Sequence, residues 1–253
     1  CLPRVRQFHQ ADCHSLVMEP QIAEEVHGPM QFLLGYYRTF GLPATVKLAT
    51  RPPTRVGTDE MWDRAEAALK AALEATGMAY ELKPGDGAFY GPKIDFDVTD
   101  SLGRAWQLGT IQLDYAAPER FDMSYTGEDN TTHRPVVIHR AVSGSFERFM
   151  AILIEHFAGA FPVWLAPEQV RILPITDDLA PPAEQATNQL RAAGIRATMD
   201  AHNDTPNYRI REAELQKVPS LADLCQREAV YGTVAPRIRR AVKKEENGEG
   251  EEL

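Results

Sequence analysis

Apolar side chains recur every three or four residues between positions 19 and 40, at Ile22, Val26, Met30, Leu33, Leu34 and Tyr37. This spacing places them on one face, so we predict a long amphipathic helix over residues 19–40. Gly41 and Pro43 follow directly and are typical of the end of a helix. A second helix is predicted from Thr58 through residue 73, in a run rich in Ala, Leu and Glu with acidic residues in its first turn.

Alternation of apolar and polar residues predicts strands over residues 3–8, 44–50, 88–100, 104–115 and 134–142. The runs 88–100 and 104–115 flank Ser101-Leu102-Gly103, which predicts a β-hairpin. A further helix is predicted to begin at Gly144 and to continue through residue 157. Because strands and helices do not alternate strictly in this region, an α+β fold with an antiparallel sheet is expected.

Beyond residue 166 the pattern becomes regular. Strands are predicted over residues 169–175, 195–200, 220–225 and 233–239, with helices over 181–194 and 206–218. Such alternation is typical of βαβ units and predicts an α/β domain with a mostly parallel sheet. We therefore predict one domain over residues 1–165, a second over 166–240, and a disordered acidic tail over 241–253, which holds five glutamates and two lysines.

The composition narrows the class of protein. The 253 residues carry a formal charge of −9, and 43% of them are hydrophobic, which is enough to bury a core. Three cysteines are too few for a disulfide framework and favour a reducing, cytoplasmic compartment. No run of 18 apolar residues occurs, so no membrane-spanning helix and no membrane partner are expected. The net acidity does not exclude an RNA partner, because cations gather at Arg237, Arg239, Arg240, Lys243 and Lys244.

Few residues indicate chemistry on their own. His14 and His139 match no local metal-binding motif, and a lone histidine is more often a hydrogen-bonded structural residue. Cys13 precedes His14, but neighbouring side chains of a strand point to opposite faces, so the two would not share one ion. Lys93 follows a Gly-Pro turn at the entrance of a strand, where it could serve a phosphate as a point charge.

Arg148 is unusual because it lies one turn into an otherwise apolar helix. If it is partly buried there, it needs an anionic partner. The alternatives are an arginine that extends to solvent, or an ion pair with Glu147 or Glu155.

Six segments, in their order and spacing, resemble the threonyl-tRNA synthetases, which are class II aminoacyl-tRNA synthetases. They are RVRQFHQADCH, LATRPPTRVGTDEMWDRAE, GAFYGPKIDFDV, WQLGTIQLDY, YTGEDN and VIHRAVSGSFERF. The resemblance runs from about residue 3 to about residue 240. It implies the later part of a class II catalytic domain, followed by the anticodon-binding domain that the threonyl, prolyl, histidyl and glycyl enzymes share. It also implies ATP-dependent activation of threonine to threonyl-adenylate and transfer to the 3′ end of tRNA(Thr).

The resemblance assigns five residues to ATP, which is used with Mg²⁺. The RVRQF segment resembles the second strand of class II motif 2, which implies that Arg4 contacts ATP and that Phe8 stacks on the adenine. GSFERF resembles motif 3, whose arginine, here Arg148, lies against the outer phosphates. Lys93 would approach the α-phosphate and Gln107 the ribose. Neutralising phosphate charge is the main catalytic device when the substrate's own carboxylate attacks.

The family holds one zinc ion per subunit by a cysteine and two histidines, and His14 and His139 match the histidine positions. The amino and hydroxyl groups of threonine bind this zinc, which excludes valine because valine lacks the hydroxyl. Residues matching the threonine pocket are Gln10, Asp12, Tyr90, Gln112 and Ser145. The family's cysteine lies upstream of the residues present, and neither Cys1 nor Cys13 occurs in its sequence context.

In the second domain, Glu228 and Arg237 are the nearest matches to the family's anticodon contacts. Class II motif 1, which builds the homodimer interface, the first strand of motif 2 and the editing domain have no counterpart in the sequence. We therefore expect a fragment of a homodimeric ligase with little or no adenylation activity alone. The alternative is a non-catalytic RNA-binding or regulatory relative that keeps the fold, while a zinc hydrolase is disfavoured because no general-base glutamate lies at helical spacing from either histidine.

Overall fold

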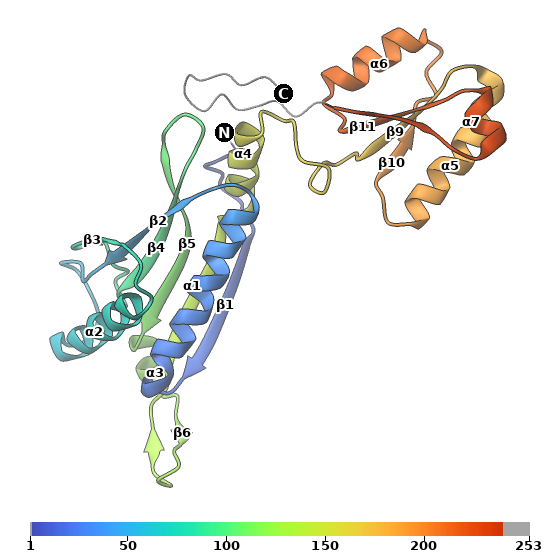
Figure 1. Ribbon diagram of the computed structural model, residues 1–253. Helices are drawn as coiled ribbons and strands as arrows, with labels where there is room; N and C mark the ends of the chain where they lie inside the picture. The colour runs from blue at the N-terminus through green and yellow to red at the C-terminus, as the bar shows by residue number, and fades with distance from the viewer. Residues whose placement is uncertain (1, 240–253) are drawn as a thin grey trace. The chain divides into compact units, whose positions relative to one another are not determined.

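The computed structural model describes residues 2–239 and divides the chain into two compact units, Cys1–His156 and Phe157–Leu253 (Figure 1). The predicted acidic tail, residues 241–253, lies outside the described residues. None of the described helices combines the length and the apolar character that a membrane span requires. The two units are built on separate sheets.

The first unit is built on a six-stranded sheet with the order β1-β8-β5-β4-β2-β3. The strands are β1 Gln10–Val17, β2 Ala44–Ala49, β3 Glu81–Lys83, β4 Lys93–Thr99, β5 Ala105–Asp114 and β8 Val136–Ser145. All neighbours are antiparallel except β2 and β3, which confirms the antiparallel α+β prediction and the β4–β5 hairpin. A separate two-stranded ribbon joins β6 Tyr125–Thr126 to β7 Thr132–His133.

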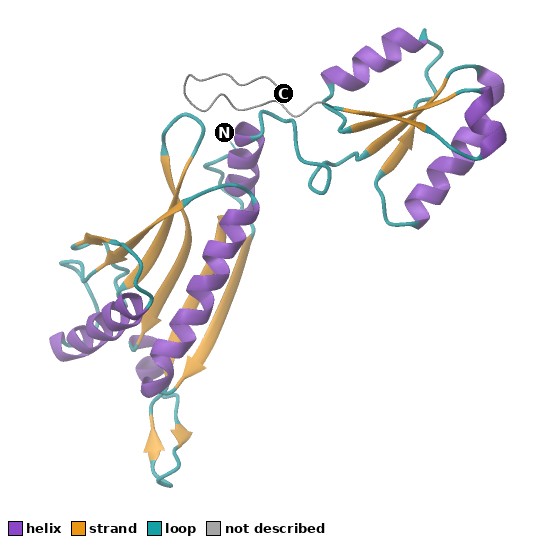
Figure 2. Ribbon diagram, viewed as in Figure 1, coloured by secondary structure: helices purple, strands orange, loops and turns teal. Residues whose placement is uncertain are grey.

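The helices of this unit are α1 Ile22–Thr39, α2 Asp59–Ala75, α3 Ala116–Arg120 and α4 Phe146–His156. Five of the six apolar positions predicted for α1 are buried, and Leu34 is half-buried. Helix α1 lies along the sheet, where the Tyr37 hydroxyl donates a hydrogen bond to the Val142 carbonyl (Figure 2). Helix α2 begins where Thr58 Oγ1 accepts from the Met61 amide at 3.3 Å.

The predicted strand over residues 3–8 is wrong, because the first strand begins at Gln10. The backbone before Gln10 forms hydrogen bonds with α4 rather than with a neighbouring strand. The Pro3 carbonyl accepts from Arg148 Nε, and the His9 carbonyl accepts from the Phe146 amide. Pro3 also has no backbone N–H to offer a strand. Arg4 and Phe8 therefore lie in an irregular segment ahead of β1.

Among the other boundaries that differ from the prediction, two have an explanation at a glycine. Strand β4 begins at Lys93 rather than at residue 88, after a turn in which a Cβ on Gly91 would lie 1.7 Å from the Leu113 carbonyl oxygen. The last helix of the unit begins at Phe146 instead of Gly144, which is the penultimate residue of β8. Gly144 has a φ of +61°, a conformation that favours glycine.

The second unit is a four-stranded sheet with the order β10-β9-β11-β12. Its elements are β9 Val170–Pro174, α5 Ala180–Ala192, β10 Ala197–Met199, α6 Pro206–Leu215, β11 Ser220–Leu224, α7 Gln226–Tyr231 and β12 Ala235–Ile238. Strands β10, β9 and β11 are parallel, and β12 is antiparallel to β11. One apolar cluster packs α5 and α7 on the sheet and a second packs α6 on it, with α6 on the face opposite α5 (Figure 2). This arrangement confirms the mostly parallel α/β prediction.

Candidate active site

Four of the predicted site residues form one row across four neighbouring strands. Lys93 on β4 lies opposite Gln112 on β5, Gln112 lies opposite His139 on β8, and His139 lies opposite His14 on β1. Residues directly opposite in antiparallel strands share a face of the sheet. The fold therefore brings together a lysine, an amide and two imidazoles that lie up to 125 positions apart in the sequence.

The two histidines face each other, with ring centroids 4.5 Å apart and the rings nearly perpendicular. His139 Nε2 lies 3.0 Å from Asp114 Oδ2, and His14 Nε2 lies 3.7 Å from Asp12 Oδ2. Within residues 2–239 no group of three histidine, cysteine or acidic side chains is arranged to hold a metal ion. The geometry thus provides two neighbouring nitrogen donors of the kind zinc prefers, but not a complete ligand set.

The neighbouring row of the sheet consists of Asp95, Thr110, Ala141 and Asp12. Thr110 Oγ1 donates to Asp95 Oδ1 at 3.0 Å and accepts from Gln112 Nε2 at 3.3 Å. Gln112 Oε1 in turn accepts from the Tyr90 hydroxyl, and the Tyr90 ring lies 5.3 Å from that of His139. These contacts connect the two rows.

The remaining predicted pocket residues lie at the end of β1 and β8. Gln10 lies opposite Ser145, and a break in strand register separates this pair from Asp12 and Ala141. Ser145 Oγ accepts from the Arg148 amide at 3.1 Å, so it caps the start of α4.

Three guanidinium groups surround one indole ring. Arg4, Arg104 and Arg148 lie 5.6, 5.5 and 5.5 Å from the Trp106 ring centroid. Arg104 is neutralised by Asp100 and Glu155. The two arginines predicted to bind ATP have no carboxylate partner among the described residues. Two cationic groups near one ring, with no carboxylate to neutralise them, attract an anion.

Arg148 is half-buried and is held by carbonyl oxygens instead of carboxylates. Its Nε donates to Pro3 O at 3.2 Å and its terminal nitrogen donates to Gln107 O at 3.0 Å. The ion pairs considered for it from the sequence do not form, because Glu147 pairs with His9 and Glu155 pairs with Arg104.

The segment that carries Phe8 is fixed to α4 by its neighbour His9. Glu147 accepts from the His9 backbone amide at 3.1 Å and lies 2.8 Å from His9 Nδ1. These hydrogen bonds lower the pKa of Glu147. The Phe8 side chain is 52% exposed, so its ring is accessible for stacking.

Burial shifts two ionisations within the polar network. Burial raises the pKa of Asp95, against the opposing effect of Lys93. Burial also raises the pKa of Tyr90, with a further contribution from the carboxylates of Asp114 and Asp12. The Tyr90 hydroxyl therefore stays protonated and acts as a hydrogen-bond donor at neutral pH.

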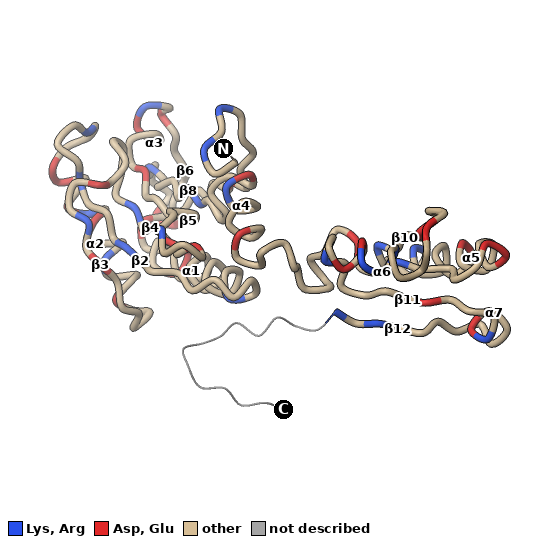
Figure 3. Tube along the Cα trace, turned by 90° about the horizontal axis from the view of Figure 1, so that it is seen from above, with Lys and Arg blue, Asp and Glu red and all other residues tan. Residues whose placement is uncertain are grey.

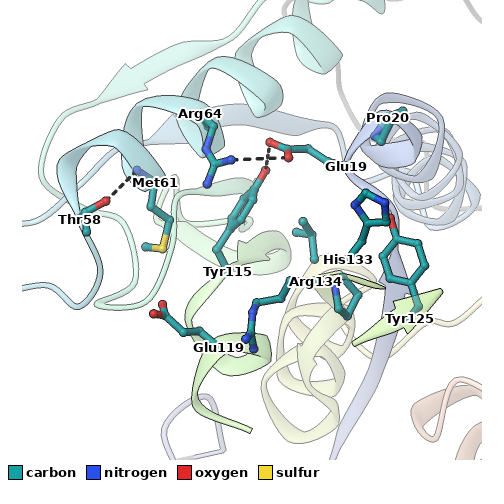
Figure 4. Close-up of a pocket in the computed structure, with 12 residues that line it drawn as sticks. Glu19, Pro20, Thr58, Met61, Arg64, Tyr115, Glu119, Tyr125, His133 and Arg134 are labelled. Carbon is teal, nitrogen blue, oxygen red and sulfur yellow. Dashed lines mark hydrogen bonds and ion pairs between the residues drawn. The ribbon is translucent and has the colours of Figure 1, made fainter. Parts of the chain in front are cut away.

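A cavity of about 850 Å³ lies elsewhere in the first unit, and none of the predicted site residues lines it (Figure 4). Its wall includes Arg64, which lies 5.6 Å from the Tyr115 ring, and Glu19, whose carboxylate accepts from the Tyr115 hydroxyl. Arg64 lies 3.7 Å from Glu19, so this guanidinium has a carboxylate partner, unlike the two arginines at Trp106.

Both predicted anticodon residues of the second unit have local partners. Arg237 on β12 lies 3.0 Å from Asp223 Oδ2, and Glu228 on α7 accepts from the Cys225 amide at 3.3 Å. Figure 3 shows basic positions in β12 and directly after it. Arg237 keeps about half of its side chain exposed, so it remains available to a phosphate or a base.

Four residues of the site were not found from the sequence: Asp95, Asp114, Trp106 and Thr110. Strand alternation was the available signal for three of them. Asp95 is two residues from Lys93, while Thr110 and Asp114 are each two from Gln112, and such pairs share a strand face. Trp106 gave no comparable signal, because its role depends on contacts with distant segments.

Two family models match the chain. A model of the "tRNA synthetase class II core domain (G, H, P, S and T)" matches residues 1–157, and a model of the "Anticodon binding domain" matches residues 169–252. The chain is 56% identical over 236 residues to a threonine–tRNA ligase of Myxococcus xanthus, with 93% of this chain and 37% of the relative covered. It is 53% identical to one of Desulforamulus reducens, with 94% and 38% covered.

A crystal structure described as the RNA binding domain of threonyl-tRNA synthetase from Cryptosporidium parvum is 40% identical, with a TM-score of 0.91. The match covers 94% of this chain and 60% of that chain. The chain thus spans less than two fifths of the length of the two sequence relatives.

Proposed function

The chain belongs to the class II tRNA synthetases, and we propose that it forms part of the catalytic domain and the anticodon-binding domain of a threonine–tRNA ligase. The proposed reaction is that of the full-length protein that carries these residues. Threonine reacts with ATP, used with Mg²⁺, to give threonyl-adenylate, and the threonyl group is then transferred to the 3′ end of tRNA(Thr).

The observation that carries this proposal is the pair of arginines on Trp106. Arg4 and Arg148 lie near one ring, and neither has a carboxylate partner among residues 2–239. A polyphosphate supplies the missing negative charge, and guanidinium groups match phosphate oxygens well. Arg148 would hold the outer phosphates, while the exposed ring of Phe8 would stack on the adenine.

During activation, the threonine carboxylate attacks the α-phosphorus, a carboxylate oxygen–phosphorus bond forms, and pyrophosphate leaves. Lys93, at the start of β4, would neutralise the α-phosphate as charge develops. Gln107 would bind the ribose, and its carbonyl already accepts from Arg148. The residues of the chain thus act by orientation and charge neutralisation, which is the usual catalysis of such transfers.

The threonine pocket would include Gln10, Asp12, Tyr90, Gln112 and Ser145. Zinc fits His14 and His139 as two of its ligands, because their rings face each other across β1 and β8, and the third ligand would come from outside residues 2–239. When bound, zinc supplies a Lewis-acidic position for the amino and hydroxyl groups of threonine. Asp12, 3.7 Å from His14, would accept from the substrate hydroxyl.

The second unit would bind the anticodon of tRNA(Thr) through residues that include Glu228 and Arg237. A homodimer and a cytoplasmic location complete the proposal. The dimer is that of the full-length enzyme, and the location accords with the presence of three cysteines in 253 residues.

The test is threonine-dependent exchange of pyrophosphate into ATP, catalysed by the purified full-length protein that carries these residues. Threonine should support exchange, whereas valine should support it at least about 100-fold less, because a site built to bind a hydroxyl rejects the analogue that lacks one. Arg148→Ala should remove most of the activity. A folded protein that gives no exchange with threonine, or equal exchange with valine, would contradict the proposal.

A further inference from the structure

Asp95 is 1% exposed and lies in the middle of the polar network of β4 and β5. Its Oδ1 accepts from Gln107 Nε2 at 2.6 Å and from Thr110 Oγ1 at 3.0 Å. Its Oδ2 lies 2.8 Å from Lys93 Nζ. One carboxylate therefore contacts both Lys93 and Gln107, which are the residues proposed to contact the α-phosphate and the ribose.

Lys93 and Asp95 form an ion pair, with the ammonium nitrogen 2.8 Å from Asp95 Oδ2. Both groups are buried, and the contact with Lys93 favours the ionised form of the Asp95 carboxyl against the effect of burial. Lys93 itself is 9% exposed, and a buried ammonium needs a counter-charge. Because an ammonium has three N–H donors, it keeps donors for a phosphate after its contact with the carboxylate.

The hydrogen bonds beyond Asp95 all have a fixed direction. The Tyr90 hydroxyl donates to Gln112 Oε1, Gln112 Nε2 donates to Thr110 Oγ1, and the Thr110 hydroxyl donates to Asp95. Because each group in this series donates to the next, the last group must accept without donating, as an ionised carboxylate does. An asparagine at the same position has one accepting oxygen instead of two, so that oxygen serves either Gln107 and Thr110 or the Lys93 ammonium, and the other side meets an N–H group.

We propose that Asp95 is a positioning residue for adenylation. It fixes Lys93 and Gln107 for ATP, and through Thr110 it orients Gln112 and Tyr90 in the threonine pocket. One buried carboxylate thereby couples the nucleotide side of the site to the amino-acid side. This inference rests on the proposed function.

The first experiment compares Asp95→Asn with a matched control, Asp97→Asn, in the full-length protein. Asp97 is a second buried carboxylate of β4, but it pairs with Lys47 at 2.8 Å. In threonine-dependent pyrophosphate exchange, Asp95→Asn should lower kcat/KM for ATP about 10- to 100-fold, since misplacement by about 1 Å costs about that much. It should also raise KM for threonine, whereas Asp97→Asn should change either parameter less than about 3-fold.

A double-mutant cycle tests whether Asp95 acts through Lys93. In a Lys93→Ala background, Asp95→Asn should lower kcat/KM for ATP by much less than it does alone, because the positioned group is already absent. Multiplicative losses in the double variant would overturn the inference.

Thr110 provides a second route if Asp95→Asn does not fold. Thr110→Val keeps the carboxylate and removes the hydroxyl link, so KM for threonine should rise more than KM for ATP. Thr110→Ser should recover most of that loss, because it keeps the hydroxyl. Equal KM values in the Val and Ser variants would overturn the inference, and so would equal behaviour of Asp95→Asn and Asp97→Asn. Absence of exchange in the wild-type protein would instead refute the proposed function.

Discussion

Replacing Asp100 by asparagine should destabilise the first unit in a pH-dependent way. Asp100 follows β4, and its carboxylate accepts from the backbone amides of Leu102 and Arg104 at 3.0 and 2.8 Å. It also accepts from Arg104 Nε at 2.6 Å and from Trp106 Nε1 at 2.8 Å. Burial of the carboxylate opposes its ionisation, but the hydrogen bonds from Trp106 and Arg104 outweigh burial and lower its pKa from 3.8 to about 2.

The size of this pKa shift determines how much stability the substitution should remove. A depression of nearly two units corresponds to about 2 kcal/mol of stability for the ionised form. Because the folded-state pKa lies below the unfolded-state value, this contribution is complete above about pH 5 and is lost as pH falls through about 2. Asp100→Asn removes it, so the free energy of unfolding should fall by about 2 kcal/mol at pH 7 and by about 1 kcal/mol at pH 3.

The assay is urea unfolding of the 253-residue chain, followed by circular dichroism at 222 nm at pH 7, 5, 4 and 3. Asp86→Asn is the control, because Asp86 is an exposed acid 3.4 Å from Lys83 and should contribute less than about 0.5 kcal/mol. A difference below about 0.5 kcal/mol between Asp100→Asn and wild type at pH 7 would refute the reasoning. A difference that grows as the pH falls would also refute it, because the sign of the linkage would be reversed.

Three further predictions concern the site and its support. Trp106→Leu should raise KM for ATP about 5- to 30-fold in pyrophosphate exchange, because each cation–π contact contributes about 0.5–2 kcal/mol. Trp106→Phe should keep most of the affinity, and equal KM values for the Leu and Phe variants would contradict the prediction. Thr58→Ala should lower the free energy of unfolding by about 1 kcal/mol through loss of the α2 cap, and Thr58→Ser should not. The 253-residue chain should bind zinc weakly, and His139→Ala should abolish that binding, as measured by competition with a chromogenic chelator. A tight one-to-one complex would show that two histidines are not the whole ligand set.

Local patterns were sufficient where one segment determines its own structure. The apolar spacing of α1 matches the face that the helix buries, and the turn at Ser101-Leu102-Gly103 pairs β4 with β5. The segment over residues 3–8 shows where local patterns fail. Its alternation is compatible with a strand, but the carbonyls of Pro3 and His9 accept hydrogen bonds from α4, which is more than 130 residues away.

The residues of the candidate site also fall into two groups: some were recognisable from the local sequence, and others depend on tertiary contacts. Arg148 was recognisable because a charged residue in an apolar helix conflicts with its surroundings. The pairing of His14 with His139 was available only through the resemblance, since strand order places β8 between β1 and β5. Trp106 lacked any signal, because its contacts with Arg4 and Arg148, which come from two distant segments, depend on tertiary structure.

A bulge in β5 explains why spacing alone could not place Gln107. Gln107 and Thr110 are three residues apart, and in a regular strand they would point to opposite faces. The register shifts here, so that Phe96 lies opposite Gly109 and Asp97 lies opposite Gln107. The extra residue returns Gln107 to the face of Thr110, where both donate to Asp95. Gly109 fits because a Cβ there would lie 2.5 Å from the Tyr37 hydroxyl of α1, so the helix that covers one face of the sheet fixes the geometry of the other.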